Sequence, residues 1–516
     1  MLLILRPDRL PGVVLFNCLL ITAMLTAQEA VPTTFGPVTG TSTEDGEVRI
    51  FRGIPFAAPP VDSLRWRAPR PPETWTEPKV CTTFAASPVQ RDPEPFSMWS
   101  AEFLIPKEPI DEDCLYLNVW AEAAARQHPV LVWIYGGGFN SGGGSVPIYD
   151  GEELARQGIV VVTINYRVGP FGFFAHPALT AESPYGASGN YGLLDQIAAL
   201  RWVRDNVAAF GGDPDRITIA GQSAGAASVH ALVASPLAAG LFRRAIAESG
   251  AMMTRGGPPL AEAEAAGERF ASALGATTLE ALRALPADKI LAAADGSARP
   301  IRDGYVLPAP MPELTTRPHA VAVDLMTGWN EDEGLVFGPI LDLAAYQKQS
   351  RDRYGEDAAD FLERYAATDN ATAERAQLDA SRDEIFGIQN YAWANVHADY
   401  SDRPVYVYRF TRKVPGEGKY ADYGAFHTGE VPYAFGNLHR VDRPFTAIDR
   451  RLSATMQQYW VNFVKHGNPN APGLPRWPVY TASTQDIILF GDTVEAGPLP
   501  DGERLDFMYY LQTVGE

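Results

Sequence analysis

The sequence predicts an α/β fold built on a doubly wound, mostly parallel sheet. Short apolar runs rich in β-branched residues recur along the chain, and segments whose apolar residues have helical spacing separate them. Residues 159–166 are apolar almost throughout, as expected of a strand that is covered on both faces. Residues 190–210 carry apolar side chains at helical spacing. Such alternation of buried strands and helices is typical of a doubly wound sheet.

The expected elements can be placed in chain order. Turn residues separate strand-like runs between Phe35 and Arg65, which predicts an N-terminal hairpin that leads into a proline-rich loop. A short helix is expected at residues 152–157. The later strands are expected at residues 115–120, 129–135, 159–166, 217–220, 244–248, 323–327 and 405–410.

Two helix-rich stretches interrupt this alternation, at about residues 251–322 and 338–401. They contain amphipathic patterns rich in Ala, Glu and Arg, which predict helices at residues 261–274, 279–294 and 344–366. We expect both stretches to be insertions that cap a site rather than independent domains. Residues 28–516 would then form one domain.

The first 27 residues differ from the rest of the chain. Arg6 and Arg9 precede an apolar run at residues 13–25, and Ala27 supplies a small residue for cleavage. This pattern predicts a secretory signal peptide and a secreted or periplasmic protein. An uncleaved membrane anchor is the alternative, and the apolar run is short for a bilayer span.

Composition and charge exclude several classes of function. The chain carries 62 acidic and 43 basic residues, a formal net charge of −19. Such a charge repels phosphate backbones, so nucleic acid is not expected as a partner. No stretch after the first 27 residues is apolar for long enough to predict a transmembrane helix, so no membrane insertion is expected once the signal is removed.

The most informative segment is R-I-T-I-A-G-Q-S-A-G-A-A-S, residues 216–228. An apolar strand pattern leads to Ser223, Gly221 and Gly225 flank the serine, and a helix of small residues follows. Strand, sharp turn and helix form a nucleophile elbow. A serine hydroxyl needs this exposure because a base must reach its oxygen and backbone N–H groups must meet the developing oxyanion. The two glycines avoid collisions between the turn and its neighbours.

A nucleophilic serine also requires a base and an acid. In α/β folds with a nucleophile elbow, the three residues follow one another along the chain in the order Ser, acid, His. His427 lies in a glycine-containing loop, G-A-F-H-T-G-E, after the last strong strand pattern. The acid candidates Glu331, Asp332 and Glu333 directly follow the strand at 323–327, and position alone does not separate them. The remaining histidines are disfavoured because they lie too early, near the elbow helix, before the acid segment, in helical patterns or beside an arginine: His128, His176, His230, His319, His397, His439 and His466.

A glycine-rich segment after a buried strand predicts an oxyanion site. It reads W-I-Y-G-G-G-F-N-S-G-G-G, residues 133–144. Consecutive glycines let backbone N–H groups face outward with no Cβ in the way. A phosphate-binding loop is the alternative, but no G-K-[ST] follows and the spacing is not G-x-G-x-x-G.

With these residues in place, the chain resembles the type-B carboxylesterase family, the carboxylesterase/cholinesterase group of α/β hydrolases. The resemblance covers nearly the whole chain after the first 27 residues. It depends on F-R-G-I-P-F-A-A-P-P (51–60), E-D-C-L-Y-L-N-V-W (112–120), Y-G-G-G-F (135–139), N-Y-R-V-G-P-F-G-F (165–173), G-N-Y-G-L-L-D-Q (189–196), F-G-G-D-P (210–214), G-Q-S-A-G and W-N-E-D-E-G.

The resemblance implies the α/β-hydrolase fold and hydrolysis of small carboxylic esters through an acyl-enzyme, with no cofactor and no metal. It implies Ser223 as nucleophile, Glu333 as acid and His427 as base. The oxyanion N–H groups would come from Gly137, Gly138 and Ala224. Two structural ion pairs are also implied: Arg65 with Glu112, and Arg167 with Asp195.

Some residues depart from the family pattern. Gln222 precedes the serine where members commonly have Glu, and Leu104 stands where cholinesterases carry the tryptophan that stacks on choline. The resemblance therefore does not imply choline specificity. A Cys81–Cys114 disulfide is left open.

Two alternatives to a general carboxylesterase follow. One is a specialised esterase or amidase acting on plant-wall, aryl or toxin esters. The other is a catalytically inactive adhesion module of the cholinesterase-like kind, which is disfavoured because all three implied catalytic residues are present.

Overall fold

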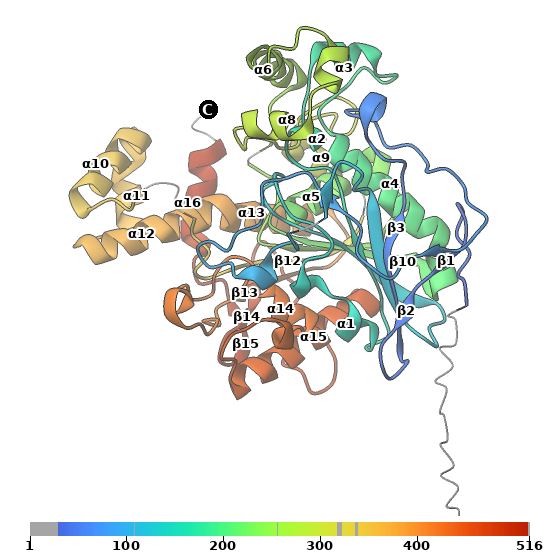
Figure 1. The fold of residues 1–516 in the computed structure, drawn as a ribbon. Coiled ribbons are helices and arrows are strands. Elements are labelled where there is room, and N and C mark those ends of the chain that lie inside the picture. Colours follow the sequence, from blue (N-terminus) through green and yellow to red (C-terminus); the bar gives the residue numbers. More distant parts are fainter. Residues whose placement is uncertain (1–28, 108, 255, 317–321, 336–338, 514–516) are drawn as a thin grey trace, which may run out of the picture.

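An 11-stranded sheet runs through the part of the molecule that the computed structural model describes, residues 29–107, 109–254, 256–316, 322–335 and 339–513 (Figure 1). The expected signal peptide at residues 1–27 lies outside these ranges. In sheet order the strands are β15 (Val494–Pro498), β14 (Asp486–Phe490), β13 (Val405–Phe410), β12 (Asp324–Asn330), β11 (Arg244–Glu248), β10 (Gly212–Gln222), β8 (His128–Ile134), β9 (Val160–Ile164), β7 (Tyr116–Glu122), β3 (Val48–Pro55) and β2 (Thr41–Ser42).

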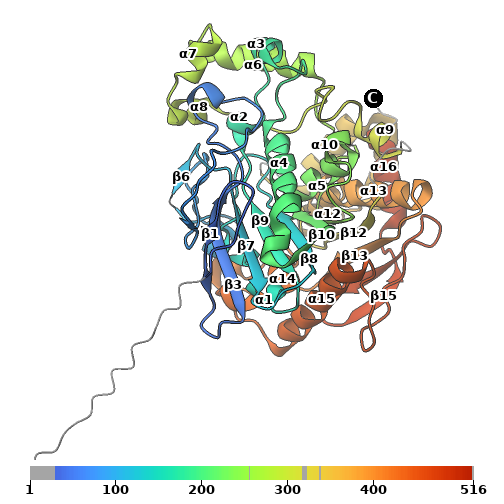
Figure 2. The same ribbon diagram turned by 90° about the vertical axis from the view of Figure 1, so that its right-hand side faces the viewer.

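Most neighbouring strands in this sheet are parallel. The block from β14 to β9 is parallel throughout, and antiparallel pairs occur only toward the two edges, where β15 pairs with β14 and where β7, β3 and β2 follow β9. In the turned view of Figure 2 the strands follow one another across the molecule from β3 to β15. The predicted doubly wound, mostly parallel sheet is confirmed.

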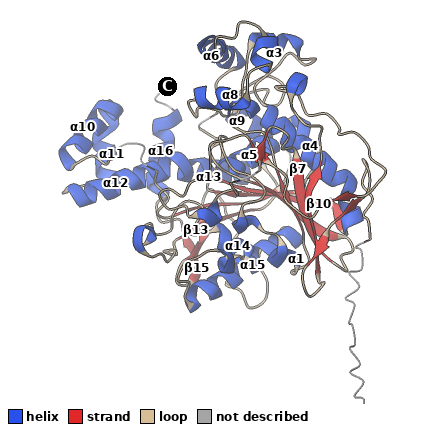
Figure 3. Ribbon diagram, in the orientation of Figure 1, coloured by secondary structure: helices blue, strands red, loops and turns tan. Residues whose placement is uncertain are grey.

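Helices cover both faces of the sheet, which explains why its central strands are apolar on both sides. Figure 3 shows α4 (Tyr191–Asn206) and α5 (Ala224–Ala234) on one face, and α1 (Glu152–Ala155), α14 (Val431–Phe435) and α15 (Ala447–His466) on the other. All five residues of β9 are buried as a result. The central strands are therefore held in place from both sides.

The helix-rich stretches lie between consecutive strands of the sheet. The first, after β11, contains α6 (Leu260–Ala273), α7 (Leu279–Arg283), α8 (Ala287–Ala293) and α9 (Met311–Thr316). The second, after β12, contains α10 (Leu343–Tyr354), α11 (Ala358–Arg364), α12 (Asn370–Arg382), a π-helical turn at Asp383–Gly387 and α13 (Ile388–Tyr400). In Figure 1 the helices α10 to α12 project to one side of the sheet.

Two of the expected helices are interrupted. Residues 279–294 form α7 and α8 instead of one helix, because Pro286 cannot donate the hydrogen bond that a continuous helix would need. Residues 344–366 form α10 and α11, and Gly355 between them has a φ of +53° that a helix does not contain. The strand at 405–410 is also not the last one, because β14 pairs with it in parallel and β15 then pairs with β14.

Both implied ion pairs lie where strands and helices meet loops. Arg167 Nη2 is 2.7 Å from Asp195 Oδ1, and both side chains are almost completely buried. Arg65 donates two hydrogen bonds to the carboxylate of Glu112, and its Nη1 also donates to the carbonyl oxygens of residues 283 and 285 in the first insertion. These contacts tie the loops before β7 and after β9 to the rest of the fold.

Cys81 and Cys114 are both buried and both free. The disulfide left open by the sequence is therefore not formed in this structure. Over the described ranges, no helix combines the length and the apolar character needed to span a membrane.

Candidate active site

Ser223 occupies the turn between β10 and α5. Its backbone angles are φ 58° and ψ −124°, a conformation that a residue with a Cβ rarely adopts. Backbone strain of this kind costs about 1–3 kcal/mol, and it persists only where the surroundings hold it. The N–H of Ser223 donates to the carbonyl oxygen of Glu248, at the end of the neighbouring strand β11, over 2.8 Å. The neighbouring strand β11 thus holds the turn in place.

The glycines beside the serine are needed because three chain segments approach closely there. A Cβ on Gly225 would lie 2.0 Å from the carbonyl oxygen of Ile134, and one on Gly221 would lie 2.6 Å from the same oxygen. A Cβ on Gly250 would lie 2.4 Å from the carbonyl oxygen of Ser223. The expected role of Gly221 and Gly225 in avoiding collisions is confirmed.

Glu333 and His427 meet next to the elbow. Glu333 lies in the loop after β12 and is fully buried. Its Oε1 accepts a hydrogen bond from the N–H of Asn330 over 2.9 Å, and its Oε2 lies 2.8 Å from Nδ1 of His427. Because the carboxylate can only accept, it selects the tautomer in which Nδ1 carries the proton and Nε2 is free to accept one.

The two other acids of the segment have different partners. Glu331 Oε2 is 2.9 Å from Nη2 of the buried Arg409, and Asp332 Oδ1 is 2.7 Å from Nη1 of Arg375. Asp332 also accepts from the N–H of Ala425, two residues before His427. Sequence position did not distinguish the three acids, but their partners do. Of the three, Glu333 is the one that contacts His427.

Aromatic and amide groups surround the His427 ring. Phe386, in the π-helical turn after α12, stacks on it with ring centroids 4.2 Å apart and an interplanar angle of 22°. The Nε2 amide nitrogen of Gln222 is 3.2 Å from Nε2 of His427. Trp99 is perpendicular to the ring, and its Nε1 donates to Thr428 Oγ1 over 3.2 Å. The His427 ring is thus held from several directions, by Phe386, Gln222 and Trp99.

The glycine-rich loop lies close to the elbow, and a Cβ on Gly136 would stand 3.0 Å from the Cβ of Ser223. Gly137 and Gly138 have φ values of +109° and +61°. The carbonyl oxygen of Gly137 accepts from the N–H groups of Asn140 and Ser141. Because C=O and N–H point in opposite directions across a trans peptide, the N–H of Gly138 points away from that turn. Ala224 is the first residue of α5, so its N–H has no partner within the helix.

A cavity of about 1370 Å³ joins these groups. Ser223, His427, Gly137 and Gly138 lie in its wall. Each insertion contributes to it as well, with Leu291 from α8 and Leu378 from α12. An aromatic and aliphatic wall comes from the loop before β6 (Ile110–Asp111) and includes Phe96, Met98, Trp99, Phe103, Leu104 and Ile105. The site therefore has room for an ester much larger than an acetate.

Comparison with known proteins agrees with this geometry. The model of the carboxylesterase family matches residues 27–508. This chain belongs to the carboxylesterase family. It is 36% identical over 507 residues to para-nitrobenzyl esterase of Bacillus subtilis (strain 168), which covers 92% of this chain and 97% of the relative. It is 36% identical over 478 residues to fumonisin B1 esterase of Sphingopyxis macrogoltabida, which covers 88% of this chain and 85% of that protein.

Solved structures give the same assignment. A PNB esterase structure matches with a TM-score of 0.79 and 34% sequence identity, over 94% of this chain and 100% of the other. The expected α/β-hydrolase fold and the resemblance to carboxylesterases are confirmed. This carboxylesterase is a carboxylic ester hydrolase.

Two buried carboxyl groups next to the site of this carboxylesterase, Glu248 and Glu430, were not predicted from the sequence. Glu248 accepts a hydrogen bond from Nε1 of Trp460 over 2.7 Å, and Glu430 accepts one from the side chain of Asn330. Burial raises the pKa of Glu248 from 4.5 to about 8. Burial raises the pKa of Glu430 well above its ordinary value, and the charges of Glu248 and Glu333 raise it further whenever those groups are ionised. Both groups therefore favour the protonated form.

Other groups around the site also escaped the sequence analysis. Glu430 carried a signal, since it lies three residues after His427 in H-T-G-E. Phe386 carried none, because its contact with His427 joins a π-helical turn to a loop distant in the sequence. His230, which the sequence disfavoured, is buried against Trp393 and accepts from the N–H of Met252, and burial lowers its pKa to about 3. His319 lies outside the described residues.

The raised pKa of Glu248 predicts a dependence of stability on pH. The folded protein keeps a proton that the unfolded chain releases above about pH 4.5, so the free energy of unfolding should fall as pH rises toward 8 and level off above it. Each pH unit in this window is worth up to about 1.4 kcal/mol. Replacing Glu248→Gln keeps an acceptor for Trp460 and removes the titration. We expect the variant to have a flatter profile and to gain most stability, relative to the wild type, at pH 8.

Urea unfolding at pH 5, 6, 7 and 8 measures this difference. The exposed Glu262 on α6 provides the control, because Glu262→Gln should leave the slope unchanged. Equal slopes for wild type and Glu248→Gln would mean that the buried carboxyl does not retain its proton.

Proposed function

We propose that Ser223, His427 and Glu333 form the catalytic triad of this esterase, with the N–H groups of Gly137, Gly138 and Ala224 as the oxyanion hole. The observation that carries the proposal is the hydrogen bond that Nδ1 of His427 donates to the buried carboxylate of Glu333, at the wall of the cavity that also contains the elbow serine. The strained backbone of Ser223 supports it, because strain at a fixed turn is common at reacting groups.

Acylation begins when the Ser223 oxygen attacks the ester carbonyl carbon. Nε2 of His427 takes the serine proton, and the carboxylate of Glu333 stabilises the imidazolium through Nδ1. The carbonyl oxygen becomes an oxyanion that accepts hydrogen bonds from the three N–H groups. The bond to the alcohol oxygen then breaks, and His427 returns the proton to that oxygen.

Deacylation uses the same groups. Water enters after the alcohol leaves, and Nε2 of His427 takes its proton as it attacks the acyl carbon. A second oxyanion forms in the same hole and collapses to release the carboxylic acid. The proton returns to Ser223. Water is the co-reactant, and each proton moves through His427.

The size of the cavity supports a bulky or aryl ester as the substrate. An aryl group can pack against the aromatic and aliphatic wall that includes Phe96, Trp99 and Phe103. Leu104 offers no aromatic face to a cationic head group and Gln222 offers it no charge, so we do not propose choline esters. The relative named for fumonisin B1 makes a toxin ester a second candidate within the same reaction.

We further propose that the protein is secreted or periplasmic. Arg6, Arg9 and the apolar run at residues 13–25, followed by Ala27, support export and cleavage near residue 27. The small-molecule ester would then be encountered outside the cytoplasm.

Replacement of the nucleophile tests the proposed function. Ser223→Ala removes the only oxygen that the proposal allows to attack, so kcat/KM for p-nitrophenyl butyrate should fall at least about 10³-fold, while circular dichroism and the unfolding transition stay close to the wild type. Ser249→Ala, one strand away, is the matched serine control. A folded Ser223→Ala enzyme with a tenth of the wild-type activity would reject the assignment.

The choice of acid is tested by three isosteric replacements. Glu333→Gln removes the charge that stabilises the imidazolium, and we expect kcat to fall about 10²- to 10⁴-fold. Glu331→Gln and Asp332→Asn remove charges that face Arg409 and Arg375. We expect both variants to lower the urea midpoint of unfolding, and kcat to fall less than about tenfold. If Glu331→Gln or Asp332→Asn is the inactive variant, the acid has been assigned wrongly.

A further inference from the structure

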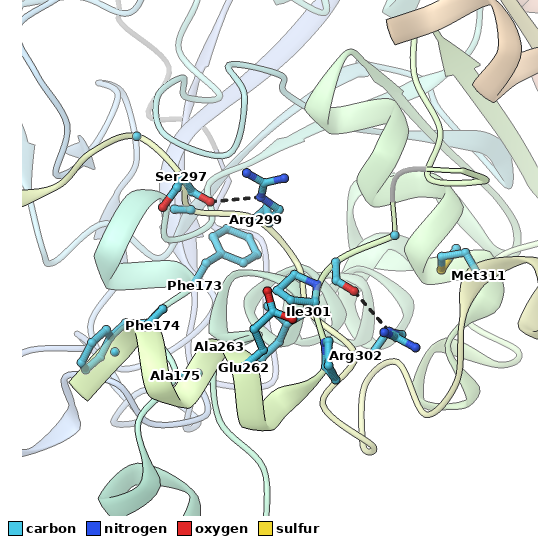
Figure 4. A pocket seen from close by; sticks show the side chains of 18 of the residues that line it. Phe173, Phe174, Ala175, Glu262, Ala263, Ser297, Arg299, Ile301, Arg302 and Met311 are labelled. Carbon is cyan, nitrogen blue, oxygen red and sulfur yellow. Dashed lines mark hydrogen bonds between the residues drawn. The ribbon is translucent and has the colours of Figure 1, made fainter. Parts of the chain in front are cut away.

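A second cavity, of about 890 Å³, lies beside the substrate cavity. Figure 4 shows Phe173, Ile301 and Arg302 around it, with Glu262 and Ala263 on α6. Phe173, Phe174, Ile301 and Met311 give it a buried apolar floor. The proposed chemistry does not use this space.

A thin strap separates the two cavities. We call residues 294–298 the strap. Its residues Ala294, Asp295 and Gly296 line both cavities, as do Pro170 and Asn140. Gly296 has a φ of +80°, and no atom lies within 4 Å of the place where its Cβ would stand. The wall at this point is therefore backbone, with open space beside it.

The side chain of Asn140 holds the strap against the oxyanion loop. Its Nδ2 donates to the carbonyl oxygen of Gly296 over 2.9 Å and lies 3.3 Å from that of Ala298. The same nitrogen donates to the carbonyl oxygen of Gly138 over 2.7 Å. Because all three partners can only accept, the amide nitrogen must face them.

The loop that Asn140 holds is itself strained. Gly137, Gly138 and Phe139 have positive φ values in succession, and Phe139 is not a glycine. Such a run needs contacts that fix it. Asn140 supplies one of them and uses the same group to fix the strap, so the oxyanion loop and the cavity wall share one polar clamp.

We propose that Asn140 is a positioning residue that sets the size limit of the substrate cavity, because its amide clamps the strap against the oxyanion loop and keeps the second cavity closed off. When the clamp is absent, the strap moves and the two cavities join. Long unbranched acyl chains then gain the apolar floor of the second cavity. This inference builds on the proposed function, because it assumes that the ester reacts at Ser223 beside Gly138.

The experiment compares kcat/KM for p-nitrophenyl acetate and p-nitrophenyl decanoate. Asn140→Ala removes the clamp, and Asn140→Asp keeps its shape but replaces the donor with an acceptor. In both variants we expect the acetate value to fall about tenfold, because the oxyanion loop is less well positioned, and the decanoate-to-acetate ratio to rise about tenfold, with the larger part of the change in KM for decanoate.

Two further variants separate the strap from the loop. Ser141→Ala removes only the hydrogen bond from Oγ to Gly137, so it should lower both rates equally and leave the ratio unchanged. Ala263→Trp, on α6, fills the second cavity. In the Asn140→Ala background it should abolish the gain on decanoate, and on its own it should leave hydrolysis of acetate as in the wild type.

An unchanged ratio in both Asn140 variants, a ratio that rises equally in Ser141→Ala, or a gain on decanoate that survives Ala263→Trp would each overturn the inference. If Asn140→Ala does not fold, Asn140→Asp decides the question with the same ratio. The proposed function fails separately, since it requires that Ser223→Ala abolish the hydrolysis of both esters whatever the ratio.

Discussion

The strained turn at Ser223 is the constraint on which the rest of the site depends. A residue with a side chain holds a backbone conformation that favours glycine, and the strain of about 1–3 kcal/mol must be offset by its surroundings. The offset comes from the hydrogen bond to Glu248 in the next strand and from the close approach that Gly225 and Gly250 allow. The parallel sheet thus brings the elbow, the acid and the histidine to the carboxyl ends of neighbouring strands.

Charge is distributed around this turn in a definite way. The acid segment sends two of its carboxylates to arginines and one to His427, so each negative charge has a specific partner. Glu248 and Glu430 favour the neutral form, because both are buried and no cation is among the described groups that shift their pKa values. Only a neutral state of this buried pair avoids placing further uncompensated charge next to Glu333. Burial without a cationic partner therefore favours the protonated form of Glu248 and Glu430 within this site.

Much of the fold and part of the site could be predicted from the sequence. The central strands have apolar runs that only a two-sided burial explains, and the elbow has a local pattern in which strand, glycines and helix agree. β14 and β15 were missed because each spans only five residues, and β15, at the edge of the sheet, contains no buried residue that would give it an apolar pattern. The helix breaks at Pro286 and Gly355 were visible as residues, but the amphipathic pattern on either side outweighed them.

The remaining features of the site depend on contacts between distant parts of the chain. Separating Glu333 from Glu331 and Asp332 requires the positions of Arg409 and Arg375, which lie in other elements. Asn140 meets Gly296 across 156 residues, and no local pattern announces that contact. The ring of Phe386 reaches His427 through a π-helical turn that propensities do not predict.

Covalent trapping of the nucleophile tests the central claim most directly. Diethyl p-nitrophenyl phosphate should transfer one diethylphosphoryl group to each chain, with loss of esterase activity in proportion to the label. Trypsin cleavage after Arg216 and Arg243 isolates residues 217–243, and tandem mass spectrometry should locate the phosphoryl group on Ser223. Complete inactivation with the label on another residue, or with no label on this peptide, would contradict the account.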